Sequence, residues 1–199
     1  MIQGIQKEDV SSDLICEYRT EETRLNPEHH TILLTPEYFY ITSKSLVPEK
    51  ILLRITQYCV SRLVSVLPAL SLTDTQQLFT KVTYFFKVSS HYACLILSEL
   101  IHSVHLIDRL ICRDAQTQDH KQRIIRHSNI GTLLLCSIII AVKYVRDIPF
   151  TNSWWSENIC VPLSIVTESE FVFLKHIQFN VSFSESRYKQ YFTLFVSTS

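Results

Sequence analysis

Apolar residues recur at helical spacing along most of the chain from residue 48 onward. The first periodic segment covers residues 48–68, and a proline stands at each end of it. A second helix is predicted from about residue 73 to 87, with Thr73 and Asp74 as its cap. A third is predicted from about residue 91 to 110, capped by Ser89 and Ser90. The polar stretch 113–126 that follows predicts a loop.

The most apolar segment of the chain is Leu133 to Val142, inside a helix predicted from about Ser128 to Arg146. Apolar residues occupy every side of this helix, so other helices must enclose it. The apolar run is much shorter than the roughly 20 residues that span a bilayer. The pattern therefore predicts a buried central helix and no membrane segment.

Two further amphipathic helices are predicted, from about residue 162 to 178 and from about Ser184 onward. Strand-like alternation is absent, and the only glycines are Gly4 and Gly131. This scarcity argues against glycine-rich phosphate-binding loops and tight hairpins. The pattern predicts an all-α fold in which amphipathic helices surround one central apolar helix.

Residues 1–47 are polar and irregular, and they are predicted to form an N-terminal extension. Within it, residues 36–42 are aromatic and either pack on the domain as a strap or contact a partner. The N-terminus lacks the basic and then apolar layout of a signal peptide.

The composition of the chain fits a globular protein, with 46% apolar and 19% charged residues. Lysine plus arginine and aspartate plus glutamate number 19 each, so the formal net charge is zero. No field of one sign therefore attracts nucleic acid or an anionic membrane. Six cysteines without CxxC spacing predict reduced core residues in a cytoplasmic or nuclear protein.

Two charged residues occupy apolar positions in the predicted helices. Glu170 lies in the apolar stripe of the helix at 162–178, and Lys143 continues the most apolar helix. A buried charge is unfavourable unless it is paired or hydrogen-bonded. Two explanations remain open: the charges form an internal ion pair or reach water, or both point into a surface that another protein completes.

Other candidate sites are weaker. His102 and His105 lie one helical turn apart, but no further ligand completes a metal site at a suitable spacing, so they predict a partly exposed helix face. Trp154 and Trp155 predict one core anchor and one surface or interface residue. No catalytic set is recognisable, so the chain is predicted to be no enzyme and to need no metal or cofactor.

The stretch 132–192, "TLLLCSIIIAVKYVRDIPFTNSWWSENICVPLSIVTESEFVFLKHIQFNVSFSESRYKQYF", resembles the second half of a cyclin box. More narrowly, it is similar to the phosphate-signalling cyclins of fungi and their P- or U-type relatives. The segment "AVKYVRD", the pair Asn152 and Trp155, and Glu170 fall on family positions. Upstream, "FTKVTYFFKVSSHYACLILSEL" resembles helices one and two, and Asn129 matches an asparagine that opens helix three.

The resemblance implies a five-helix cyclin box over residues 70–197, with 48–68 as an N-terminal flanking helix. It also implies a non-catalytic subunit that forms a heterodimer with a cyclin-dependent protein kinase, in cell-cycle control or phosphate signalling. In the family, a lysine–glutamate pair that maps onto Lys143 and Glu170 clamps the kinase. The apolar floor around that pair maps onto Ile140, Tyr144, Leu174 and Phe179.

The sequence departs from the family pattern at several places. Arg146 replaces an aspartate before Asp147, and this reversal is predicted to influence which kinase is accepted. Ile159 and Cys160 replace a glycine pair, and Gly131 with Thr132 replaces a histidine–arginine pair. The helix-two signature is out of register, because Ile101-His102 stands in its place and the similar string "LIDRL" follows at 106–110. The arginine–hydrophobic substrate-docking motif of cell-cycle cyclins is not visible in helix one.

Two alternatives to a kinase-activating cyclin remain. A cyclin-fold adaptor would keep the core and bind a non-kinase partner, without needing Lys143 or Glu170. A small α-helical enzyme would require a catalytic set, which the sequence does not display.

Overall fold

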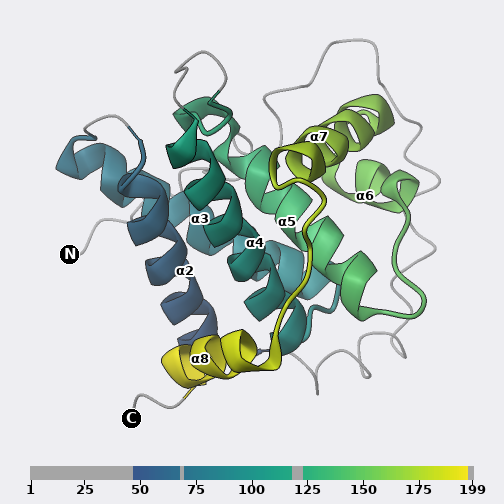
Figure 1. The fold of residues 1–199 in the computed structure, drawn as a ribbon, viewed down its shortest axis with the longest axis horizontal. Helices are drawn as coiled ribbons and strands as arrows, with labels where there is room; N and C mark the ends of the chain where they lie inside the picture. Colours follow the sequence, from purple (N-terminus) through teal and green to yellow (C-terminus); the bar gives the residue numbers. More distant parts are fainter. Residues whose placement is uncertain (1–46, 68–69, 118–122, 197–199) are drawn as a thin grey trace, which may run out of the picture.

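A computed structural model describes residues 47–67, 70–117 and 123–196, and it is all-α within these ranges. The predicted extension 1–47, with its aromatic stretch 36–42, lies outside the described residues except for Val47. The helices, shown in Figure 1, are α2 (Glu49–Val64), α3 (Leu72–Tyr92), α4 (Leu97–Gln116), the 3₁₀ helix η3 (His127–Asn129), α5 (Ile130–Val145), α6 (Asn152–Ile159), α7 (Leu163–His176) and α8 (Glu185–Val196).

Helix α5 lies in the middle of the fold, between α4 and α7 (Figure 1). Every residue from Leu133 to Val142 is buried, so the predicted central helix is confirmed. By length and composition alone, His127–Val145 could cross a membrane. Its burial among neighbouring helices is that of a core helix.

Helix α4 is a second central helix, which the sequence pattern did not predict. It packs against α2, α5, α7 and α8, and all residues from Glu99 to Asp108 are buried. The prediction that His102 and His105 form a partly exposed face is therefore wrong. The segment that joins α7 to α8, residues 177–184, covers both rings.

The predicted boundary between the second and third helices is also wrong. Ser89 and Ser90 do not cap a new helix, because they are buried within α3. The helix stops only where Cys94 takes a left-handed conformation, with φ of 48°, and the Leu95 amide donates to the Ser90 carbonyl at 3.2 Å. Ser71 begins α3, since its hydroxyl accepts from the Asp74 amide.

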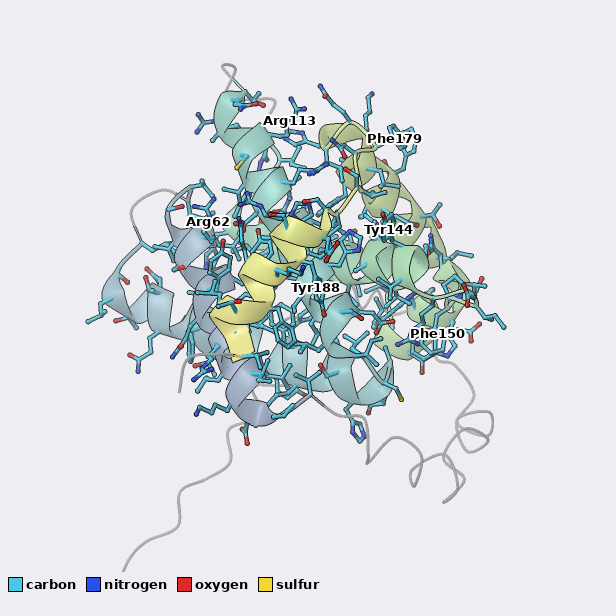
Figure 2. All side chains as sticks on the ribbon, turned by 60° about the horizontal axis from the view of Figure 1, so that its bottom comes forward. Arg62, Arg113, Tyr144, Phe150, Phe179 and Tyr188 are labelled. Carbon is cyan, nitrogen blue, oxygen red and sulfur yellow. The ribbon has the colours of Figure 1, made fainter. Side chains whose placement is uncertain are left out.

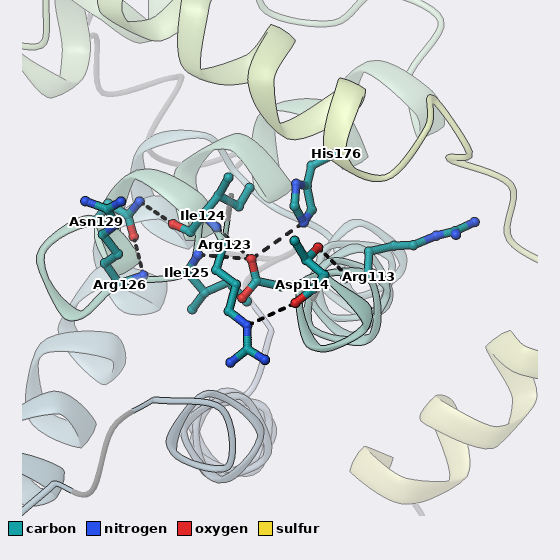
Figure 3. Close-up of polar contacts among 9 residues, drawn as sticks. Arg113, Asp114, Arg123, Ile124, Ile125, Arg126, Asn129 and His176 are labelled. Atoms are coloured by element: carbon teal, nitrogen blue, oxygen red, sulfur yellow. Dashed lines mark hydrogen bonds and ion pairs between the residues drawn. The ribbon is translucent and has the colours of Figure 1, made fainter. Parts of the chain in front are cut away.

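The predicted loop 113–126 is shorter than expected, because α4 continues to Gln116. A buried carboxylate supports the additional turn, since Asp114 Oδ1 accepts from the Ile124 amide at 2.7 Å (Figure 3). The same oxygen lies 3.6 Å from Nε2 of His176 at the end of α7. Asp114 therefore joins the end of α4 to the returning chain, with His176 of α7 close to it.

Asn129 fixes the entry into α5, where the sequence places the start of a helix. Its side-chain amide donates to the Ile124 carbonyl at 2.8 Å, and its Oδ1 accepts from the Arg126 amide at 3.0 Å (Figure 3). These bonds close the turn that leads through η3 into the central helix.

The short helix α6 was not predicted. Thr151 caps it, because its hydroxyl accepts from the Trp154 amide at 3.2 Å. Trp155 is buried, whereas Trp154 is half-buried and stacks on Phe150 with ring centroids 3.9 Å apart. The predicted core tryptophan is therefore Trp155, whereas Trp154 packs partly on the core and its surface or interface role stays a prediction.

Four residues other than glycine adopt left-handed backbone conformations within the described residues, and each follows a helix. Cys94 follows α3, Cys160 follows α6, and Gln178 with Phe179 follows α7. Helix ends of this kind are usually recognised by glycine. With glycine only at positions 4 and 131, the sequence gives no such signal.

Asp108 joins three helices at one carboxylate. Its Oδ2 accepts from the hydroxyls of Tyr58 on α2 and Tyr191 on α8, at 2.5 and 2.6 Å, and its Oδ1 accepts from Arg62 Nε at 2.6 Å. Burial, followed by the bond to Asp108, raises the pKa of Tyr58 to about 12 and raises the pKa of Tyr191 as well. Both phenols therefore remain neutral donors.

Candidate protein-interaction site

Lys143 and Glu170 form an ion pair between the last turn of α5 and the middle of α7. Lys143 Nζ donates to Glu170 Oε1 and Oε2 at 2.6 and 2.8 Å. Asn152, the first residue of α6, accepts from the same ammonium at 2.8 Å and donates its own amide to Glu170 Oε2 at 2.7 Å. Of the two explanations for these charges, the internal pair is the arrangement in this structure.

The two members of the pair differ in exposure. The Glu170 side chain is 11% exposed, whereas that of Lys143 is 33% exposed. All three ammonium protons of Lys143 have acceptors within the cluster, so this group has no donor to offer a partner. Glu170 Oε1 accepts one described bond, which leaves it able to accept another.

Exposed aromatic side chains lie on or next to the two helices that carry the ion pair. Tyr144 is 51% exposed and Phe179 is 56% exposed, and Figure 2 shows both on the side formed by α5 and α7. Leu174 is half-buried and packs on the core, while Ile140 is fully inside it. Thus four of the six residues that the resemblance assigns to kinase binding reach the surface at least in part, whereas Ile140 and Glu170 are buried.

Phe171 belongs to the same surface, although the sequence analysis did not single it out. It follows Glu170 on α7, is exposed, and meets the Phe179 ring edge-on at 6.1 Å between centroids. An apolar residue next to the buried stripe of an amphipathic helix could have indicated it. The α5–α7 face comprises Lys143, Tyr144, Glu170, Phe171, Leu174 and Phe179.

The turn after α7 directs Phe179 outward. Phe179 has φ of 53°, and its amide donates to the Leu174 carbonyl at 2.7 Å, which closes the helix. Two residues later, the Val181 carbonyl lies 3.0 Å from His102 Nε2. Tyr144 packs edge-on against the same imidazole, with 4.5 Å between the ring centroids. His102 therefore contacts both Tyr144 of α5 and the segment that follows α7.

Arg146 is committed to contacts inside the chain. Its guanidinium makes two bonds to the buried Glu99 carboxylate and donates to the carbonyls of Ala93 and Cys94 at 3.0 and 3.1 Å. It also lies 5.1 Å from the ring centre of Phe150. Arg146 thereby fixes the start of α4 to the end of α5, and its influence on kinase choice stays a prediction.

Asp147, the second residue suggested for specificity, is exposed. It follows Arg146 directly in the chain, beyond the end of α5. Of Arg146 and Asp147, it is therefore Asp147 whose charge is more accessible to a partner.

The two buried histidines are neutral. Burial lowers the pKa of His102 to about 4, with the positive charge of Arg109 and the neighbouring His105 as further causes. Burial and then Arg109 lower the pKa of His105. Within the ranges that the structure describes, no three His, Cys, Asp or Glu side chains are placed to hold a metal ion.

The cysteines only partly match their prediction as core residues. Cys59 and Cys136 are buried, and burial raises the pKa of both thiols. Cys112 and Cys160 are exposed, so for them the prediction is wrong. All five cysteines in the described residues are free thiols, and Cys16 lies outside these residues.

A small apolar cavity of about 70 Å³ lies on another side of α5, between α3, α6 and α7. Tyr92 and Trp154 line it, and Gly131 contributes no side chain to fill it. Gly131 and Thr132, where the sequence departs from the pattern that it resembles, both line this cavity.

Comparison with protein-family models, curated proteins and solved structures finds no match to this chain. The resemblance to a cyclin box therefore stays a prediction that the geometry can support and experiment must test.

Proposed function

We propose that this chain is a cyclin-type regulatory subunit that binds and activates a cyclin-dependent protein kinase through the α5–α7 face. In this proposal, α3, α4, α5, α7 and α8 are the five helices of a cyclin box, and α2 is its flanking helix. The observation that carries it is a fixed, neutralised ion pair among exposed aromatic side chains, at the positions the resemblance assigns to kinase contact.

The physical properties of the face support protein binding. Large aromatic side chains dominate the energetics of protein interfaces, and Tyr144, Phe171 and Phe179 are about half exposed. Because Lys143 and Glu170 already neutralise each other, covering them with a partner requires less desolvation than covering two free charges. The face is therefore ready to be buried without rearrangement of its charges.

The hydrogen-bond inventory specifies how the partner contacts the pair. Lys143 has no free donor, whereas Glu170 Oε1 retains an acceptor site. A partner N–H therefore bonds Glu170, and Lys143 holds that carboxylate in position. Seating the kinase's movable helix on this face shifts the kinase toward its active conformation, because the complex forms better with that state.

A pull-down tests the binding step. The full chain, used as bait in an extract of its source cells, recovers a cyclin-dependent kinase, which mass spectrometry identifies. The double variant Tyr144→Ser/Phe179→Ser loses the kinase while it keeps the cooperative unfolding transition of the parent, because both side chains are about half exposed. The matched control is Leu72→Ser, which removes an 85% exposed apolar side chain at the start of α3. Failure to recover a kinase, or equal recovery by the double variant, contradicts the proposal.

A second candidate is an adaptor of the same fold that binds a non-kinase protein. The observation that favours it is Arg146, which replaces an acidic family residue and is bound to Glu99 within the chain. The same pull-down separates the two functions, because an adaptor recovers a partner other than a kinase.

A further inference from the structure

Three arginines gather where α4 passes the 177–184 linker and the start of α8. Arg109 and Arg113 lie one turn apart on α4, and Arg187 is in the first turn of α8. In the described ranges 47–67, 70–117 and 123–196, no ion pair includes any of them. Their acceptors are neutral: the Asn180 carbonyl at 2.6 Å for Arg109, Gln178 Oε1 at 2.8 Å for Arg113, and Gln190 Oε1 at 3.1 Å for Arg187.

Two arginines elsewhere in the fold provide a contrast. Arg62 is paired with Asp108, and Arg146 is paired with Glu99. At the cluster, burial and then the positive charges of Arg113 and Arg187 lower the pKa of Arg109. The cluster is thus a local excess of positive charge on a chain of zero formal net charge.

The cluster borders an open pocket of about 520 Å³ between α4 and α8. Figure 2 shows α8 crossing in front of α4, with Arg113 near the outer end of α4. Hydroxyl and cationic groups dominate the lining, which comprises His105, Asp108, Arg109, Cys112, Ser182, Ser184, Ser186, Arg187 and Gln190. The one carboxylate there is Asp108, which is paired with Arg62 and accepts hydrogen bonds from two tyrosine hydroxyls.

From this arrangement we infer that the pocket between α4 and α8 binds the phosphate group of a phosphorylated serine or threonine on another polypeptide. A phosphate ester carries close to two negative charges at neutral pH and three acceptor oxygens. Arg109 and Arg187 supply planar guanidinium donors, and the hydroxyls of Ser184 and Ser186 supply short donors beside them, whereas the Ser182 hydroxyl donates to Asn180 Oδ1 at 2.7 Å. This inference is independent of the kinase-binding proposal.

The openness of the pocket favours a phosphate attached to a chain. Small-molecule sites bury most of their ligand, whereas this pocket is open to solvent beside α8. Arg187 and all three lining serines are exposed. An extended segment can therefore lie across the opening and insert only its phosphate between the arginines.

A binding assay with the full chain tests this inference. The probe is a fluorescent library of heptapeptides with a central phosphoserine and degenerate flanks, followed by fluorescence anisotropy. We expect the phosphorylated library to bind, the matched serine library not to bind, and added salt to weaken binding. Arg187→Gln reduces the affinity at least about tenfold, the equivalent of one charge-assisted hydrogen bond, and Arg187→Glu abolishes it.

The matched control is Lys189→Gln, which removes one positive charge two residues further along α8. Lys189 pairs with Glu185 and does not line the pocket. The Lys189→Gln variant is therefore expected to bind the phosphorylated library within about twofold of the affinity of the parent. Equal binding of both libraries, absence of binding, or equal effects of Arg187→Gln and Lys189→Gln overturn the inference. Inorganic phosphate that binds as tightly as the phosphopeptides overturns the assignment to a polypeptide.

Discussion

The α5–α7 face and the pocket between α4 and α8 both include residues of the 177–184 linker, and they differ in how their charges are paired. On the face, Lys143 and Glu170 neutralise each other, so exposed aromatic rings determine what it can bind. At the pocket, Arg109 and Arg187 have only neutral acceptors, so an anion remains to be supplied. The comparison shows that the kind of ligand a surface can bind depends more on whether its charges are paired within the chain than on how many charges it has.

Each region rests on a buried carboxylate that joins three helices, and the two carboxylates differ in how many residues donate to them. Asp108 on α4 accepts from donors on α2 and α8. Glu170 on α7 accepts from Lys143 on α5 and Asn152 on α6. Because three residues donate to Asp108 and only two donate to Glu170, we expect the larger loss of stability at Asp108.

The largest expected effect is that of Asp108→Ala. This variant leaves the hydroxyls of Tyr58 and Tyr191 without their acceptor and lowers the free energy of unfolding by roughly 3 to 5 kcal/mol. Urea denaturation followed by circular dichroism measures the change. Asp147→Ala is the control, since this exposed carboxylate contributes within about 0.5 kcal/mol. A loss below about 1 kcal/mol at Asp108 would falsify its role as the common anchor.

The two members of the Lys143–Glu170 ion pair are expected to contribute unequally to stability, and single substitutions measure each contribution. Lys143→Ala leaves the buried Glu170 with Asn152 alone and lowers the unfolding free energy by roughly 3 kcal/mol. Glu170→Ala has a smaller effect, about 1 to 2 kcal/mol, because the one-third exposed Lys143 can reach water. The double variant is expected to lose less than the sum of the two. The reverse order of the single variants contradicts this account.

Acidification acts on the buried His102 at the back of the α5–α7 face. The folded pKa of about 4 lies below the unfolded value of about 6.5, so the unfolded chain binds protons first as the pH falls. The unfolding free energy is therefore constant above the unfolded pKa and falls below it, by roughly 1 kcal/mol between pH 7.5 and 5.5. His105, whose pKa is also lowered, adds to the loss. Urea denaturation at both pH values should show that the unfolding free energy of His102→Phe changes less with pH than that of the parent. An equal change in both proteins contradicts the role of His102.

The smallest expected effect lies at a helix end away from both regions. Cys160 follows α6 with φ of 54°, a conformation that is unfavourable for residues with a Cβ. Cys160→Gly raises the unfolding free energy by about 0.5 to 1 kcal/mol. Cys112→Gly, an exposed change inside α4, lowers it by a similar amount, and thermal denaturation distinguishes the two directions.

The sequence predicted those features that depend on periodicity within one segment. The apolar run through Leu133 to Val142 identified the central helix, and the position of Glu170 in an apolar stripe identified a buried charge. The pattern could not distinguish an internal ion pair from an interface contact, because that depends on where α5 and α7 meet. Asn152, which bridges the pair, was noted only as part of a family turn.

The features that were missed depend on contacts between distant segments or on unusual helix ends. The burial of His102 and His105 comes from a linker more than 70 residues away in the sequence. Arg109 and Arg187 come together only when α8 packs on α4. The α3–α4 boundary was misplaced because Cys94, and no glycine, ends the helix.

Reconstitution of the kinase reaction tests the central claim most directly. The kinase recovered with the chain is separated from it, and its rate of phosphate transfer from ATP to a peptide substrate is measured with and without added chain. We expect the rate to rise in step with heterodimer formation, and the Tyr144→Ser/Phe179→Ser variant to give no increase. A heterodimer that forms while the rate stays at that of the free kinase contradicts the account.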